Sequence, residues 1–178
     1  METATNPSTE TPFWRFSLHF YRQPGVSEAC IALQDGCGVD VNLLLFLFWL
    51  AACRRQLSAA NVKGLDDGVR DWRNLTIVPI RDVRRKLKGA ATLVAPSRHE
   101  AFRTKIKAIE LEAERLQQEA LYEATRAKMP GAEAAPPTAA RANVAAYAAV
   151  LGTNLPPAAI DALLRAFDGI DPKGFIAA

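Results

Sequence analysis

An unbroken apolar run, Leu43–Cys53, constrains this chain more than any other feature. It follows an aromatic segment in which Phe13, Phe16 and Phe20 recur at helical spacing. So much apolar surface in one quarter of the chain must be buried in a hydrophobic core, because its exposure to water is unfavourable. No β alternation of useful length accompanies it. The sequence therefore predicts an all-α protein: a compact orthogonal helical core with one long helix and a small C-terminal helical hairpin.

The length of the apolar run favours a core helix over a membrane span. Its eleven residues fall short of the roughly 20 that cross a bilayer, and Arg54 and Arg55 close it. The first residues, Met1–Asn6, are polar and include an acidic one, unlike a secretory signal. The cysteines are odd in number and, with the two histidines, match no zinc spacing. We expect a cytoplasmic protein with free thiols, no metal, no cofactor and no stable membrane insertion.

Capping residues and helix breakers divide the first half of the chain. Thr11 and Pro12 suit the start of a helix, Pro24 and Gly25 break it, and Asp40 suits the N-cap of the apolar helix. We expect Pro79 to interrupt or kink a later helix. The predicted elements are a disordered leader (1–10), a helix from Pro12 to the Pro24 break, and helices over 26–34, 41–57, 66–77 and 80–88, with a loop over 58–64.

A long helix is predicted over residues 97–128. Ser97 and Glu100 match a capping box at its start. Apolar residues then step by four and three along it, and this heptad-like seam needs a partner surface. The protein's own helices or a second copy, in a homodimer through helix 97–128, both satisfy that need. The seam comprises Phe102, Ile106, Ile109, Ala113, Leu116 and Ala120.

Composition predicts the domain organisation of the rest. Residues 129–140 are rich in alanine and proline, as linkers are. They separate a core domain, 11–128, from a C-terminal hairpin, 141–178, with helices over about 140–151 and 157–167. Whether the hairpin packs on the core is left open by the sequence.

A polar group at the entrance to the apolar helix is the first candidate site. Polar side chains at the mouth of an apolar pocket suit a small ligand, and two carboxylates at one loop suit acid and base chemistry. Helix capping explains the same residues more simply, above all Asp40. The candidate ligand-binding residues are Gln34, Asp35, Asp40 and Asn42. No catalytic signature is present, so the sequence leans away from an enzyme.

A basic segment is the second candidate site. Between Arg54 and Lys107 the chain has 14 basic residues against 5 acidic ones. Such a cluster can bind a protein partner or the phosphates of nucleic acid, or it can complement acidic residues of the same chain, such as those from Glu110 onward. No aromatic residues are interleaved as in an RNA-binding motif. The residues concerned are Arg81, Arg84, Arg85 and Lys88.

An ordered series of residues resembles a family of small helical bacterial proteins, mostly proteobacterial, classed as domain of unknown function 2390. The similarity covers roughly Phe13 to Tyr122 and includes Phe13-Trp14-x-Phe16-Ser17-Leu18, Pro24-Gly25-Val26, Leu33-Gln34-Asp35, Asp40-Val41-Asn42-Leu43-Leu44 and Trp49. It implies a bacterial intracellular protein but no activity. The leading hypothesis is a non-enzymatic accessory protein that presents its basic face and long helix to a protein partner; the alternatives are a small-ligand pocket at Gln34–Asn42 and nucleic-acid binding.

Overall fold

The computed structural model describes residues 11–89 and 94–175, and the predicted leader lies outside these residues. The all-α fold is confirmed. The helices are α1 (Pro12–Tyr21), α2 (Val26–Cys37), α3 (Val41–Ala52), α4 (Ala59–Trp72), a π-helical turn η1 (Arg73–Ile77), α5 (Val78–Leu87), α6 (Pro96–Arg126), α7 (Pro136–Leu151), α8 (Pro157–Asp168) and a 3-10 turn η2 (Pro172–Gly174). Two short strands, β1 (Arg55–Gln56) and β2 (Ala132–Glu133), pair antiparallel.

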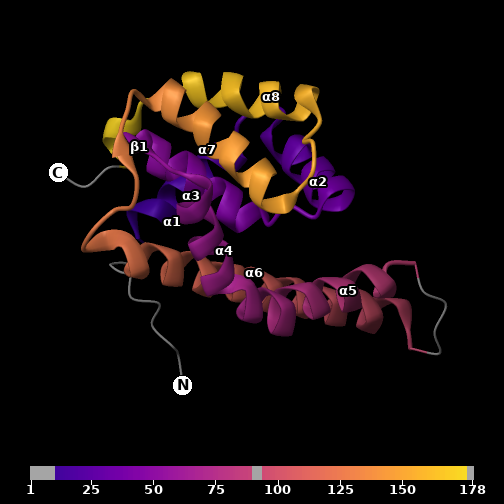
Figure 1. Cartoon of the computed structure of the whole chain (residues 1–178). Coiled ribbons are helices and arrows are strands. Elements are labelled where there is room, and N and C mark those ends of the chain that lie inside the picture. The colour runs from indigo at the N-terminus through magenta and orange to yellow at the C-terminus, as the bar shows by residue number, and fades with distance from the viewer. Residues whose placement is uncertain (1–10, 90–93, 176–178) are drawn as a thin grey trace.

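The helices form two layers (Figure 1). Helices α1, α2, α3, α7 and α8 make up a core layer, with α7 packed on α3 and α8 on α2. Below it α6 runs the length of the molecule, and its C-terminal half contacts α1 and α3. Helix α5 lies alongside the N-terminal half of α6, and α4 leads into it from the core layer. We call α5 together with residues 96–111 of α6 the arm.

Helix α3 is the centre of the core layer, as predicted. All but its first residue are buried. Phe13 meets Phe46 edge to face with ring centroids 4.8 Å apart, and Phe46 stacks on Trp49 at 5.3 Å. Such pairs stabilise beyond the apolar area that they bury. No helix in the described residues is long and apolar enough to cross a membrane.

Helix α3 ends at Ala52, five residues before the predicted end at Leu57. Arg54 takes a left-handed conformation, φ 63°, and turns the chain into β1. The backbone N–H of Leu57 then donates to Asn143 Oδ1 at 2.7 Å, while Asn143 Nδ2 donates to the carbonyls of Leu47 and Arg55. Contacts with residues far along the chain therefore replace the last helical turn.

The predicted loop at 58–64 is wrong, because α4 begins at Ala59. The Ser58 hydroxyl accepts from the backbone of Asn61, and the Asn61 side chain accepts from the backbone of Ser58. This reciprocal cap offsets the cost of two helical glycines. Pro79 does not interrupt the helix either. The π turn η1 carries the chain into α5, with the Val78 N–H bonded to the carbonyl of Arg73, and π turns of this kind often occur at functional sites.

The start and the seam of α6 also differ from the prediction. The helix begins at Pro96 without a side-chain cap, so the Ser97–Glu100 capping box is wrong, and Glu100 instead pairs with Arg103. Only part of the predicted seam is buried. The buried residues of α6 are Glu110, Ala113, Gln117, Gln118, Leu121 and Thr125, whereas Phe102, Ile109 and Leu116 are exposed. The buried side of α6 therefore includes polar residues, because Gln117 and Gln118 form hydrogen bonds with Asp40 and Asn42 of other elements.

The C-terminal helices pack on the core layer. Tyr147 of α7 is fully buried, and its hydroxyl oxygen accepts from the backbone N–H of Asp40 at 2.9 Å. Phe167 of α8 lies against Phe20 and Phe48. The predicted linker contains β2 and the first turn of α7, which begins at Pro136. The hairpin that the sequence left unplaced therefore forms one wall of the hydrophobic core.

Candidate functional site

A pocket of about 590 Å³ lies between the core layer and the arm. Helices α1, α2 and α3 supply one side, and α5 and α6 supply the other. Its apolar lining consists of Trp14, Leu18, Ile31, Val41, Leu45 and Leu111. A cavity of this volume is within the range of small-molecule sites, which combine apolar walls with a few placed polar groups.

The pocket brings together the two sets of residues that the sequence singled out. Gln34 and Asp35 at the end of α2 and Asn42 in the first turn of α3 line one side. Arg81, Arg84, Arg85 and Lys88 line the other. The two segments are about forty residues apart in the chain, and they meet only because α5 folds back along α6.

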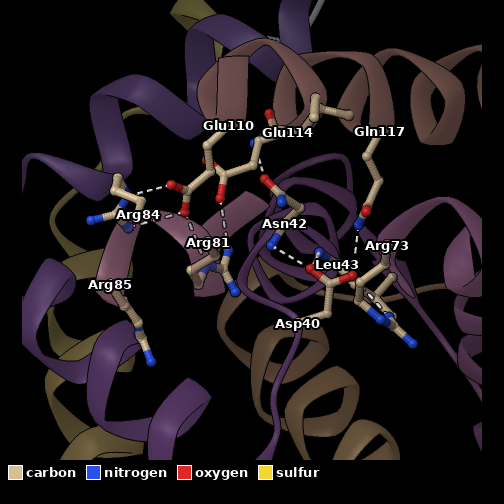
Figure 2. A network of polar contacts seen from close by, with 12 residues as sticks. Asp40, Asn42, Leu43, Arg73, Arg81, Arg84, Arg85, Glu110, Glu114 and Gln117 are labelled. Atoms are coloured by element: carbon tan, nitrogen blue, oxygen red, sulfur yellow. Dashed lines mark hydrogen bonds and ion pairs between the residues drawn. The ribbon is translucent and has the colours of Figure 1, made fainter. Parts of the chain in front are cut away.

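Asp40 is the one predicted residue that does not line the pocket. Its Oδ1 caps α3 by accepting from the backbone N–H groups of Asn42 and Leu43. Its Oδ2 accepts from Arg73 at 2.9 Å and from Gln117 at 2.6 Å (Figure 2). Arg73 bridges onward to Asp66 at 2.8 Å. Asp40 thus joins α3, η1 and α6 in a buried polar layer beside the pocket.

Two arginines of the basic segment are held by carboxylates of α6. Arg81 donates to Glu110 at 3.1 Å and to Glu114 at 2.8 Å, and Arg84 donates to Glu110 through two nitrogens (Figure 2). The side chain of Glu110 is only 7% exposed and that of Arg81 only 16%. This cluster attaches α5 to α6 and forms the polar end of the pocket.

The two carboxylates of this cluster differ in their acidity. Burial disfavours ionisation of Glu110, but hydrogen bonds from Arg84 and Arg81 outweigh it and lower its pKa. Burial raises the pKa of Glu114 above the ordinary value, because Arg81 offsets the desolvation only in part and Glu110 adds like charge. Of the two, Glu114 is therefore the group that takes up a proton first as the pH falls.

Three neutral side chains that line the pocket are joined by hydrogen bonds. Gln118 Nε2 donates to Asn42 Oδ1 at 2.8 Å, and Ser17 Oγ donates to Gln118 Oε1 at 2.7 Å. All three residues are buried and line the pocket. Ser17, Gln118 and Glu114 were not among the site residues predicted from the sequence. Gln117 and Gln118 lie outside the predicted apolar seam, where polar side chains are expected to face solvent, so nothing in the sequence indicates that they are buried.

Basic side chains outnumber acidic ones around the pocket. Seven basic residues line it, against three acidic ones, Asp35, Glu110 and Glu114. Asp35 pairs with Arg85 at 2.8 Å, and both side chains are nearly half exposed, so this link is weak. Arg22, Lys88 and Lys107 form no ion pair with any residue that the structure describes. The seven are Arg22, Arg81, Arg84, Arg85, Lys88, Arg103 and Lys107.

The lining of the pocket combines positive charge with an apolar wall. Burial raises the pKa of Cys30 and of Cys53 to about 12, so neither is a thiolate at neutral pH. Among residues 11–89 and 94–175, no group of three histidine, cysteine, aspartate or glutamate side chains is placed to hold a metal ion. An excess of positive charge next to an apolar wall suits an anionic group attached to an apolar body.

Comparison with known families gives one match. The model of the family described as Protein of unknown function (DUF2390) matches residues 12–121. The matched segment runs from the start of α1 to Leu121 in α6, and it contains every residue that lines the pocket. Comparison with curated proteins and with solved structures yields no significant match.

Proposed function

This chain belongs to the family DUF2390, and we propose that it is a non-catalytic binding protein for a small anionic ligand with an apolar body. The single observation that carries the proposal is the surplus of basic side chains around an apolar-walled pocket. Carboxylates and phosphate or sulfate esters joined to a short hydrocarbon or aromatic group have the required chemistry. Arg22, Lys88 and Lys107, which form no ion pair among the described residues, would receive the anionic group. The wall around Trp14 and Leu45 would receive the body.

The ion pairs of the pocket favour a small ligand over nucleic acid. A phosphate backbone is bound by arginine and lysine side chains that reach outward from a surface. Arg81 and Arg84 are turned inward to Glu110 and Glu114, which leaves Arg85, Lys86 and Lys88 as the exposed cations of the segment. Of these, Arg85 and Lys88 line the pocket. Three cations at the end of one short helix are a poor match for an extended polyanion, whereas the two that line the pocket suit one anionic group.

An accessory role in the cytoplasm of a bacterium is compatible with this proposal. A bound ligand would touch both the core layer and the arm, and ligands that bridge two elements favour the arrangement that they bind. We infer that ligand binding fixes the position of the arm against the core layer, and that a protein partner recognises this state through the exposed side of the arm. This part rests on ligand binding and falls with it.

Binding of an anionic fluorescent probe tests the proposed site. Anilinonaphthalene sulfonate has one sulfonate on an aromatic body, and octanoate is a matched competitor with a carboxylate on a short chain. We expect the probe to fluoresce on binding and octanoate to displace it. The double variant Arg85→Gln/Lys107→Gln should weaken both by about tenfold, since each lost charge removes on the order of 0.5 to 1 kcal/mol.

The control variant removes the same charge elsewhere. Arg15→Gln/Arg141→Gln changes two exposed residues on α1 and α7 that do not line the pocket. It should bind probe and octanoate as the wild type does. Equal weakening in both double variants would mean that net charge, and not the pocket, attracts the anions, and the proposal would be wrong.

A further inference from the structure

One side of α6 is apolar and uncovered. Phe102 and Ile109 are each 53% exposed and Leu116 is 40% exposed. They are seven residues apart, so they form a single stripe along the helix, about 21 Å long at 1.5 Å per residue. The α6 residues that line the pocket fall on a different side of the helix. They are Arg103, Lys107, Glu110, Leu111, Glu114 and Gln118. The stripe is therefore separate from the proposed ligand site.

Charged residues beside the stripe also recur every seven positions, and their signs are ordered. Arg98 and Lys105 come first and Glu112 and Glu119 follow. This order opposes the helix dipole, which favours acidic residues near the N-terminus and basic ones near the C-terminus. Glu112 and Glu119 both pair with Arg115 within the helix, and the side chains of these pairs are between 30% and 54% exposed. Arg98 and Lys105, in contrast, form no ion pair with a residue that the structure describes.

We propose that a second copy of this chain docks antiparallel on this stripe, with Ile109 at the two-fold axis. In that register Ile109 packs on its own symmetry mate, and Phe102 packs on Leu116 of the other copy. Lys105 then faces Glu112, and Arg98 faces Glu119. Because the contact is symmetric, each of these pairs occurs twice, except the Ile109 pair on the axis, which occurs once. In a parallel arrangement these charged residues would lie at opposite edges of the contact, so none of these ion pairs would form.

The charge pattern is the reason for proposing a second copy of this chain as the partner. A sequence of two positive and two negative positions is complementary to itself only when reversed, and helices that pair in this way set their orientation by the flanking charges. Trp72, at the end of α4, adds a further exposed apolar side chain near α6: its indole donates to the carbonyl of Ala113, and the residue remains 40% exposed. The inference goes beyond ligand binding and does not depend on it.

Sedimentation velocity across a concentration series tests the docking. We expect the wild type to pass from monomer to dimer in the micromolar range, since three apolar layers make a modest interface. Ile109→Lys should weaken association by at least roughly tenfold, because it places two lysines at the axis. Ile109 is more than half exposed, so the variant should keep its circular dichroism and melting temperature.

Charge exchange tests the register. Lys105→Glu should weaken the dimer, since glutamate would then face Glu112, and the double variant Lys105→Glu/Glu112→Lys should restore it. A wild type that stays monomeric up to several hundred micromolar would overturn the proposal. A dimer that Ile109→Lys leaves intact, or one that the double variant fails to restore, would overturn the interface or its register. None of these substitutions touches the pocket, so ligand binding stands or falls separately.

Discussion

The core layer and the arm are built on different principles. In the core layer, α3 is enclosed by α1, α6 and α7, and large aromatic side chains such as Trp49 and Phe46 have almost no exposure. In the arm, α5 has no buried residue at all. Its attachment to α6 rests on the ion pairs of Arg81 and Arg84 and on partly covered apolar side chains.

The pocket lies at the boundary between the region held by apolar packing and the region held by ion pairs. Apolar packing is dense and leaves few voids, whereas an element held by charged side chains can stand off from its neighbour. The pocket has an apolar wall from the core layer and a charged wall from the arm. The pocket therefore forms only when the core layer and the arm come together, because neither region supplies both walls.

The largest expected effect is in the core layer. Trp49→Ala should lower the free energy of unfolding by about 4 kcal/mol, because it removes a fully buried ring and leaves a cavity. Val83→Ala in the arm should cost less than about 1 kcal/mol, since Val83 is 46% exposed. Urea unfolding of both variants measures the contrast. Equal losses would contradict the distinction between the two regions.

The second-largest loss of stability is expected in the buried polar layer around Asp40. Asp40→Ala removes the cap of α3 and leaves Arg73 with Asp66 as its only carboxylate among the described residues. We expect a loss of about 3 kcal/mol, from the cap and from the partly unpaired buried charge. Asp67→Ala is the matched control, because its ion pairs are exposed. Its unfolding free energy should fall by less than about 0.5 kcal/mol.

The ion pairs of the arm should matter less, and mainly locally. Glu110→Gln should cost about 2 kcal/mol and speed amide exchange in α5 while the exchange of α3 stays slow. Because the pKa of Glu110 is lowered in the folded protein, its ion pairs stabilise the fold fully above the ordinary glutamate value of 4.5. This stabilisation is lost as the pH falls through the lowered pKa. Asp35→Asn, at an exposed pair, is the control. Uniformly faster exchange in both regions would contradict a separate arm.

The smallest expected effect concerns the pH dependence of anion binding. The pKa of Glu114 is raised above 4.5 by burial. As the pH falls from neutrality, Glu114 takes up a proton and the pocket loses one negative charge. Anilinonaphthalene sulfonate, whose sulfonate stays ionised, should therefore bind roughly two- to threefold more tightly. Glu114→Gln should bind at the tighter level and lose this dependence. A variant that keeps the wild-type pH profile would show that another group titrates.

Much of the fold is encoded locally. The apolar run, Thr11 and Asp40 predict the starts of α1 and α3 correctly because caps and hydrophobic runs act within a few residues. The errors arise where distant partners decide. Asn143 and β2 end α3 early, and the partners of Gln117 and Gln118 choose the buried side of α6.

The candidate site shows the same limit. The sequence identified Gln34, Asp35 and Asn42 as one group and the basic segment as another, but nothing in either indicates that they face the same cavity. Their meeting depends on the π turn η1, which keeps the helix continuous past Pro79. Glu114, whose charge tempers the basic end of the pocket, lies in an acidic stretch of α6 that resembles an ordinary solvated face.

The indole N–H signals of the three tryptophans offer the most direct test of the pocket. Trp14 lines it, Trp49 lies in the core layer, and the Trp72 indole donates to the carbonyl of Ala113 in α6. Nitrogen-15 spectra recorded during a titration with octanoate, with the signals assigned by Trp→Phe variants, report on all three at once. We predict that the Trp14 signal shifts in a saturable way while those of Trp49 and Trp72 stay in place. A Trp14 signal that does not move, or three signals that drift together without saturation, would contradict an anion-binding pocket between the core layer and the arm.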